Sequence, residues 1–188
     1  MDCSSTRVGL RTMNFISLVL IVGASVSSGY SGKPSGEWLA EWLNVPVVNE
    51  ARTCQVLTET VAAMQVPPNS LGVNLDASYW DSYQADCAEP VKAVKTFYAK
   101  SHGSRVLIAT VPLRDAGGFY KWWCEAKTEA QSCRLEINAA IKGGCVGNCV
   151  LIDADEVYRG RENEDIHLAP DVWKDEARKL MARLHAIR

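Results

Sequence analysis

The stretch MNFISLVLIV, residues 13–22, has two interpretations, and the fold depends on which one holds. It is a run of apolar and β-branched residues that ends at Gly23, which is typical of a central strand buried on both faces of a parallel sheet. It also follows Arg7 and Arg11 and precedes small residues, which is the layout of a secretory signal peptide. With about 10 apolar positions it is too short for a membrane-spanning helix, which needs about 20 residues. We therefore expect no integral membrane segment, and the residues downstream must decide between strand and signal peptide.

The rest of the chain alternates between segments typical of strands and segments typical of helices. Strand patterns occupy residues 45–48, 70–75, 105–112 and 149–157, and helix patterns occupy residues 38–43, 53–64, 90–100, 131–142 and 170–187. This alternation predicts an α/β protein with three layers, α/β/α, around a mostly parallel five-stranded sheet of the flavodoxin-like kind.

One domain is enough for this chain, because 188 residues can bury a single α/β core. We expect that domain over residues 13–188, preceded by a disordered extension at residues 1–12. Residues 115–132 are the least regular segment and the candidate for an inserted loop or lid.

The charges are balanced and mixed along the chain. The 20 Lys and Arg residues are interspersed with 22 Asp and Glu residues, for a formal net charge of −2. No basic tract offers the phosphate attraction on which nucleic-acid binders rely, so we expect no nucleic-acid partner. The composition is that of an ordinary globular protein, and we expect a monomer.

Seven cysteines raise the question of the redox compartment. Cys3 stands apart from six others: Cys54, Cys87, Cys124, Cys133, Cys145 and Cys149. In an oxidising compartment the close pairs Cys124/Cys133 and Cys145/Cys149 could each close a short loop, although sequence alone leaves the connectivity open. The spacings lack the paired Cys-x-x-Cys of structural zinc modules, so we expect no metal site. The chain is cytoplasmic if residues 13–22 are the first strand with no separate signal, and exported or periplasmic if the six cysteines form disulfides.

Three polar residues follow predicted strands, where open α/β sheets bind their ligands. Ser25 follows the first strand, Asn74 ends the third, and His167 lies between the last strand and the last helix. A hydroxyl, a side-chain amide and an imidazole are what acyl transfer requires as nucleophile, oxyanion donor and base.

Four sequence blocks around these residues resemble those of the SGNH/GDSL hydrolases, a family of serine esterases and lipases. VGASVSSGY at residues 22–30 is similar to the family's Gly-Asp-Ser block, and VVNEA at residues 47–51 to its second block. LGVN at residues 71–74 resembles the Gly-x-Asn block, and EDIHLAP at residues 164–170 the Asp-x-x-His block. The blocks occur in the family's order from Phe15 to the C-terminus, so the resemblance implies the SGNH fold over most of the chain.

The resemblance implies serine-dependent hydrolysis of a carboxylic ester through an acyl-enzyme. Ser25 would be the nucleophile and His167 the general base. The oxyanion hole would use the N–H of Ser25, the side chain of Asn74 and a backbone N–H at Ala51, with Gly72 in the same block as Asn74. No metal or organic cofactor is needed, and the substrate would be a small-molecule or carbohydrate ester, with an acetyl or other short-chain acyl group.

The chain departs from the family pattern at three places. Ala24 stands where the family has Asp, and Ala51 or Arg52 stands where a glycine donates its N–H to the oxyanion. Two carboxylates could complete the triad: register favours Glu164, three residues before His167, whereas residue type favours Asp165.

Two other functions remain open. The first is an exported, disulfide-bonded binding protein from which residues up to about 24 or 28 are removed as a signal peptide. The second is a catalytically silent SGNH-like fold that binds carbohydrate or protein, suggested by the substitutions at Ala24 and Ala51.

Overall fold

The computed structural model describes residues 16–76, 81, 86–112, 128–160 and 167–186. Its elements in chain order are β1 (Leu18–Ile21), α1 (Ser25–Ser28), α2 (Ser35–Leu43), β2 (Val47–Asn49), α3 (Leu57–Ala63), β3 (Ser70–Asn74), α4 (Ala88–Lys100), β4 (Arg105–Ala109), α5 (Thr128–Gly144), β5 (Cys149–Ile152), α6 (Ala154–Val157) and α7 (Pro170–Ala186). In this described part five strands form one sheet in the order β2-β1-β3-β4-β5, and every neighbouring pair is parallel. The predicted parallel, five-stranded α/β sheet is confirmed, with the flavodoxin-like strand order.

The opening apolar stretch contributes an inner strand of this sheet. Leu20 of β1 pairs with Val48 of β2 on one side and with Gly72 of β3 on the other. Val19 and Ile21 are completely buried. A strand covered on both faces has no polar face, which is why the stretch shows an unbroken apolar run instead of alternation.

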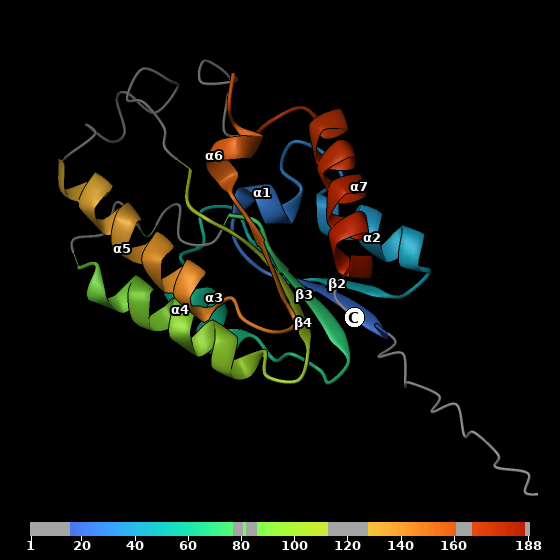
Figure 1. Ribbon diagram of the computed structural model, residues 1–188, viewed down its shortest axis with the longest axis horizontal. Helices are drawn as coiled ribbons and strands as arrows, with labels where there is room; N and C mark the ends of the chain where they lie inside the picture. The colour runs from blue at the N-terminus through green and yellow to red at the C-terminus, as the bar shows by residue number, and fades with distance from the viewer. Residues whose placement is uncertain (1–15, 77–80, 82–85, 113–127, 161–166, 187–188) are drawn as a thin grey trace, which may run out of the picture.

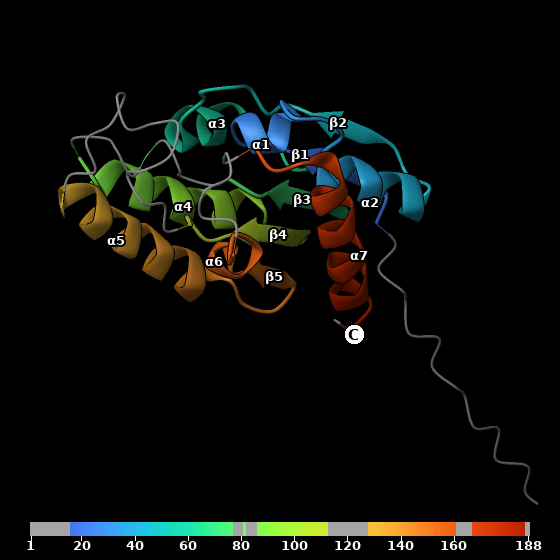
Figure 2. The same cartoon turned by 90° about the horizontal axis from the view of Figure 1, so that it is seen from above.

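Helices cover both faces of the sheet, as predicted for three layers. Figures 1 and 2 show α3, α4 and α5 on one face and α2 with α7 on the other. Phe97 of α4 and Ile137 of α5 are buried on the first side, and Leu39 of α2 and Leu180 of α7 on the second. Within the described residues, no helix is long and apolar enough to cross a bilayer.

The largest differences from the boundaries expected from sequence occur at three places. The strand expected over residues 149–157 ends at Ile152, because the Asp153 side chain accepts the N–H of Asp155 and starts α6. The helix expected from residue 53 begins at Leu57, whose N–H donates to Oδ2 of Asp81 at 2.7 Å. The last five residues of the expected lid, residues 128–132, belong to α5, and residues 115–127 lie outside the described residues.

Two disulfides link described residues. Cys145 and Cys149 are bonded, as the close spacing predicted. The other expected pair is wrong for Cys133, which is bonded to Cys87. The reason is that α4 and α5 pack side by side and bring these two Cα atoms to 5.3 Å, whereas Cys124 lies outside the described residues. Cys54 is exposed and unbonded in the described part.

Candidate active site

The carboxyl ends of β1 and β3 bring two predicted site residues to the same edge of the sheet. Ile21, the last residue of β1, pairs with Val73, and Asn74 ends β3. Ser25 begins α1 four residues after β1 ends. The strand order reverses at this point, since β1 has β2 on one side and β3 on the other. Ligands of open α/β sheets bind at such a reversal.

The segment from residue 23 to residue 28, called the Ser25 turn below, is held by a carboxylate. The N–H of Ala24 donates to Oδ1 of Asp76 at 3.0 Å, and the N–H of Val26 donates to Oδ2 at 2.9 Å. Ser25 itself is 5% exposed, and its own N–H makes no hydrogen bond with the described residues. The turn therefore presents one unengaged N–H and a hydroxyl from the same residue.

His167 reaches this turn from the other end of the chain. Its Nε2 lies 2.8 Å from Oγ of Ser25, although 142 residues separate the two. The neighbouring Leu168 is buried, and its carbonyl accepts the indole N–H of Trp173 at 3.1 Å. The first turn of α7 thus fixes the backbone beside His167, so that the imidazole is held against Ser25. In Figure 1 this end of α7 lies on the same side of the sheet as α1.

Tyr30 covers the imidazole. The two ring centroids are 4.6 Å apart with an interplanar angle of 43°, and Tyr30 is 67% exposed. An exposed aromatic ring packed on the His167 imidazole forms part of the rim of the candidate site. Sequence reasoning gave this tyrosine no role, and its only signal is its position five residues after Ser25.

Asn74 carries a buried amide that has no hydrogen-bond partner among the described residues. The residue is completely buried, and neither Oδ1 nor Nδ2 makes a hydrogen bond within the described part. The Asn74 Oδ1 atom faces Gly23, since a Cβ added to that glycine would lie 2.9 Å from it. Because an unsatisfied buried amide is costly, the side-chain amide of Asn74 is available to donate to a ligand.

The other two oxyanion candidates are placed differently. The N–H of Ala51 already donates to Oδ1 of Asn49 at 3.1 Å, and the next N–H, that of Arg52, donates to the carbonyl of Gly23 at 3.1 Å. Gly72 lies in the middle of β3, paired on both sides, two residues before the strand ends. Within the part of the chain that the structure describes, Ser25 and Asn74 are therefore the two candidates whose donors are unengaged.

The two candidate carboxylates of the triad, Glu164 and Asp165, lie outside the described residues. The acid that would orient His167 therefore stays a prediction.

Asp76 is a site residue that sequence reasoning missed. Besides the two backbone N–H groups it accepts the hydroxyl of Ser27 at 2.6 Å. Burial raises the pKa of the Asp76 carboxyl, and the hydrogen bonds from Ser27, Ala24 and Val26 oppose that rise. The available signal was its place two residues after Asn74, because side chains two apart in an extended segment point to the same side.

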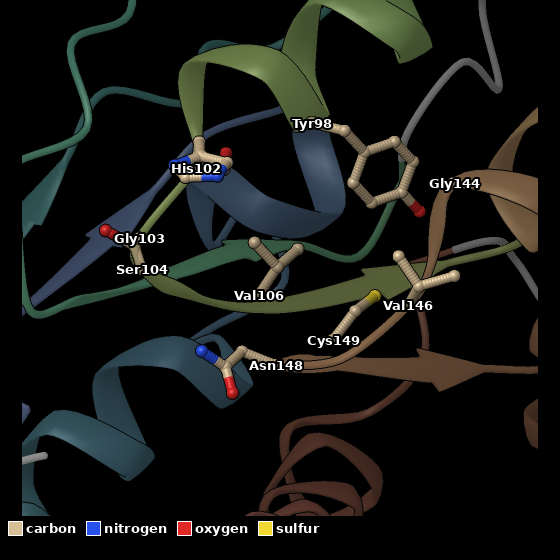
Figure 3. Close-up of a pocket in the computed structure, with 10 residues that line it drawn as sticks. Tyr98, His102, Gly103, Ser104, Val106, Gly144, Val146, Asn148 and Cys149 are labelled. Atoms are coloured by element: carbon tan, nitrogen blue, oxygen red, sulfur yellow. The ribbon is translucent and has the colours of Figure 1, made fainter.

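A cavity of about 260 Å³ lies at the opposite edge of the sheet (Figure 3). It is lined by His102 and Gly103 after α4, by Ser104 just before β4, and by Asn148 just before β5. These residues precede strands whose carboxyl ends face the site, so this cavity is separate from the Ser25 turn. Among the described residues, no three His, Cys, Asp or Glu side chains are grouped to hold a metal ion.

Comparisons with known proteins give the fold a name. No family model matches the sequence, and no curated protein sequence matches it. The lipase/acylhydrolase from Enterococcus faecalis aligns with a TM-score of 0.65 and 14% identity, over 91% of this chain and 96% of that one. A member of the lipolytic protein G-D-S-L family from Veillonella parvula aligns with a TM-score of 0.63 and 16% identity, over 89% and 100%. The aryl esterase of M. smegmatis gives 0.62 and 12%, over 92% and 100%. The chain has the SGNH/GDSL hydrolase fold, as the sequence blocks predicted.

Proposed function

We propose that this protein is a serine esterase in which Ser25 attacks the ester carbonyl and His167 acts as general base. The observation that carries the proposal is the 2.8 Å separation between Nε2 of His167 and Oγ of Ser25. This is the distance at which an imidazole can take the hydroxyl proton as the oxygen attacks. Each of the two residues was predicted from its own position in the sequence, and the contact between their side chains supports the proposal.

The proposed reaction has two stages. First, the neutral imidazole takes the Ser25 proton at Nε2 while Oγ attacks the carbonyl carbon, and the imidazolium then returns that proton to the departing alcohol. Second, His167 takes a proton from water, the hydroxide attacks the acyl carbon, and the carboxylic acid leaves as the proton returns to Oγ. Glu164 or Asp165 would accept the second N–H of the ring and stabilise the imidazolium.

The oxyanion would be stabilised by the N–H of Ser25 and by the amide of Asn74. Both donors are unengaged within the described residues. The N–H of Ala51 could join them by donating to the oxyanion in place of Oδ1 of Asn49, because the Asn49 side chain is exposed and its oxygen can then bind water. Donors fixed before the reaction stabilise the transition state without reorganisation, and one such donor is worth about 10²- to 10³-fold in kcat.

An ester of a small molecule or a carbohydrate, with a short acyl group, is the proposed substrate class. Similar structures are named an aryl esterase and a lipase/acylhydrolase, which supports ester chemistry. Screening a panel of esters would identify the alcohol and the acyl group.

The decisive experiment combines a fluorophosphonate probe with turnover of p-nitrophenyl acetate. We expect Ser25→Ala to abolish labelling, and His167→Ala to slow turnover by about 10²- to 10⁴-fold, the usual contribution of a general base. Ser17→Ala and His185→Ala alter an exposed serine and an exposed histidine outside the site and serve as matched controls. Of Glu164→Gln and Asp165→Asn, the variant with the larger loss identifies the acid. A folded wild-type protein that neither labels nor turns over would overturn the proposal.

A silent binding protein with the same fold is the second candidate. It is favoured by one observation, the engagement of the Ala51 and Arg52 N–H groups where the family's oxyanion donor would lie. An unreactive Ser25 in a correctly folded protein would select this candidate over the esterase.

A further inference from the structure

The Asp76 carboxylate is bound to the backbone on both sides of Ser25. Its Oδ1 accepts the N–H of Ala24 and its Oδ2 accepts the N–H of Val26, while the N–H of Ser25 between them makes no hydrogen bond with the described residues. From this pattern we infer that Asp76 is a positioning residue for the reaction: it clamps the Ser25 turn and leaves the Ser25 N–H for the oxyanion. The inference rests on the esterase function proposed above.

Ser27 ties the clamp to the segment that follows β3. Its oxygen accepts the N–H of Leu75 at 3.2 Å, and its own proton is donated to Oδ1 of Asp76 at 2.6 Å. In each of its hydrogen bonds the Asp76 carboxylate is the acceptor. Such a set favours the ionised acceptor, and charge-assisted hydrogen bonds are about twice as strong as neutral ones. The strength of these contacts makes the position of the turn depend on Asp76.

Gly23 lies where three polar side chains meet. A Cβ added there would be 2.3 Å from Oδ1 of Asp76, 2.7 Å from Oγ of Ser27 and 2.9 Å from Oδ1 of Asn74. The glycine has a φ of +122°, so both its backbone and its lack of a side chain are required. The carboxylate can approach the turn this closely only because residue 23 has no side chain.

Asn74 and Asp76 reach the turn from the same short segment. They are two residues apart at the end of β3, and both are at least nine-tenths buried. One backbone segment thus carries the proposed oxyanion amide and the clamp of the proposed nucleophile. Loss of the clamp should therefore change the alignment of hydroxyl and oxyanion donors, with little effect on how substrate first binds.

Asp81 provides a matched control. It is also buried, and it accepts the N–H of Leu57 at the start of α3, a helix that carries no candidate site residue. Asp76→Asn and Asp81→Asn make the same chemical change at two buried helix starts. Only the first one lies at Ser25.

The functional test compares these two variants with wild type by fluorophosphonate labelling rate and by kcat and KM for p-nitrophenyl acetate. In Asp76→Asn an NH₂ group replaces one carboxylate oxygen. This NH₂ group then faces a backbone N–H, so one of the two hydrogen bonds to Ala24 and Val26 is lost. We expect kcat and the labelling rate to fall at least about tenfold with KM within about twofold, and Asp81→Asn to match wild type. Equal rates in all three folded proteins would overturn the inference.

A second measurement needs no catalysis. Hydrogen exchange followed by NMR should show the Ala24 and Val26 amides protected in wild type and exchanging at least about tenfold faster in Asp76→Asn, but not in Asp81→Asn. Unchanged protection would overturn the clamp whatever the enzyme does. Failure of wild type to label would instead overturn the proposed function, and the exchange result would still decide the clamp.

Ser27→Ala covers the case in which Asp76→Asn does not fold. It removes one donor to Oδ1 and keeps both backbone contacts. A smaller fall in labelling rate with unchanged KM supports the inference, and a lower melting temperature with an unchanged labelling rate contradicts it.

Discussion

Two buried aspartates, Asp76 and Asp81, show how the same local contact can serve different ends. Asp76 is 6% exposed and Asp81 is 1% exposed, and each accepts a backbone N–H at the beginning of a helix. Burial raises the pKa of both carboxyls. The difference lies in their oxygens: both oxygens of Asp76 accept hydrogen bonds, whereas Oδ1 of Asp81 has no partner in the described part of the chain. The carboxylate of Asp76, with both oxygens engaged, holds the backbone on both sides of Ser25, whereas that of Asp81 holds one N–H at the start of α3.

The strongest way to break this comparison is to fill the space beside Asp76. Gly23→Ala would place a Cβ 2.3 Å from Oδ1 and would force a φ that L-residues avoid. Overpacking and backbone strain together should lower the free energy of unfolding by about 3 to 5 kcal/mol, measured by urea denaturation. Labelling of Ser25 should be lost with it.

Gly103→Ala is the control for that variant. Gly103 also has a positive φ, +85°, but nothing lies within 4 Å of an added Cβ. It should cost about 1 kcal/mol, from backbone strain alone. Similar losses in the two variants would mean that the space beside Asp76 does not matter.

The next largest effect is expected at Asp81 and depends on pH. Burial raises the pKa of Asp81 to about 6, from an ordinary value of 3.8. The folded protein therefore holds this proton more tightly than the unfolded chain, so its stabilising contribution is complete below about pH 3.8 and is lost as pH rises through about 6. Asn cannot ionise and can still accept the N–H of Leu57.

Asp81→Asn should accordingly match wild type at pH 4 and exceed its unfolding free energy by about 2 to 3 kcal/mol at pH 8. Urea denaturation at the two pH values measures this difference. A constant difference between pH 4 and pH 8 would show that Asp81 does not titrate in this range.

The smallest expected effect is at Ser28, whose hydroxyl donates to the carbonyl of Ser25 at 2.9 Å. Ser28→Ala removes this half-buried bond without touching Asp76, so it should cost about 0.5 to 1 kcal/mol. Thermal unfolding should shift by about 2 °C, and the labelling rate should not change. A labelling rate as low as that of Asp76→Asn would assign the shape of the turn to this hydroxyl instead of to the carboxylate.

The inner parts of the fold could be predicted because burial leaves a local pattern. The unbroken apolar run of β1 and that of β4 follow from being covered on both faces. The end of β5 and the start of α3 left no such local pattern in the sequence. After β5 the sequence reads DADEV over residues 153–157, and the side chain of Asp153 starts the helix α6 there. The start of α3 depends on Asp81, 24 residues further along the chain.

The residues of the candidate site also fall into those that could be predicted from the sequence and those that could not. Ser25, Asn74 and His167 could be proposed because each carries a reactive side chain just after a predicted strand or before a predicted helix. Asp76 could not, because its partners at Ala24 and Val26 are backbone N–H groups, which every residue except proline has. The disulfide to Cys87 was missed for a related reason: it reflects the packing of α4 on α5 and not distance along the chain.

Ser25 and His167 are 142 positions apart in the sequence, which gives the proposed chemistry an order in time. During translation the proposed nucleophile emerges from the ribosome early, and Asp76 soon afterwards. The proposed base emerges late, and its loop is fastened only when Trp173 in the first turn of α7 reaches the carbonyl of Leu168. In a nascent chain in which α7 has not docked, Asp76 can already hold the Ser25 turn, but the imidazole of His167 is not yet held against Ser25. Turnover would begin only once α7 has docked, so that esterase activity would report the docking of this helix.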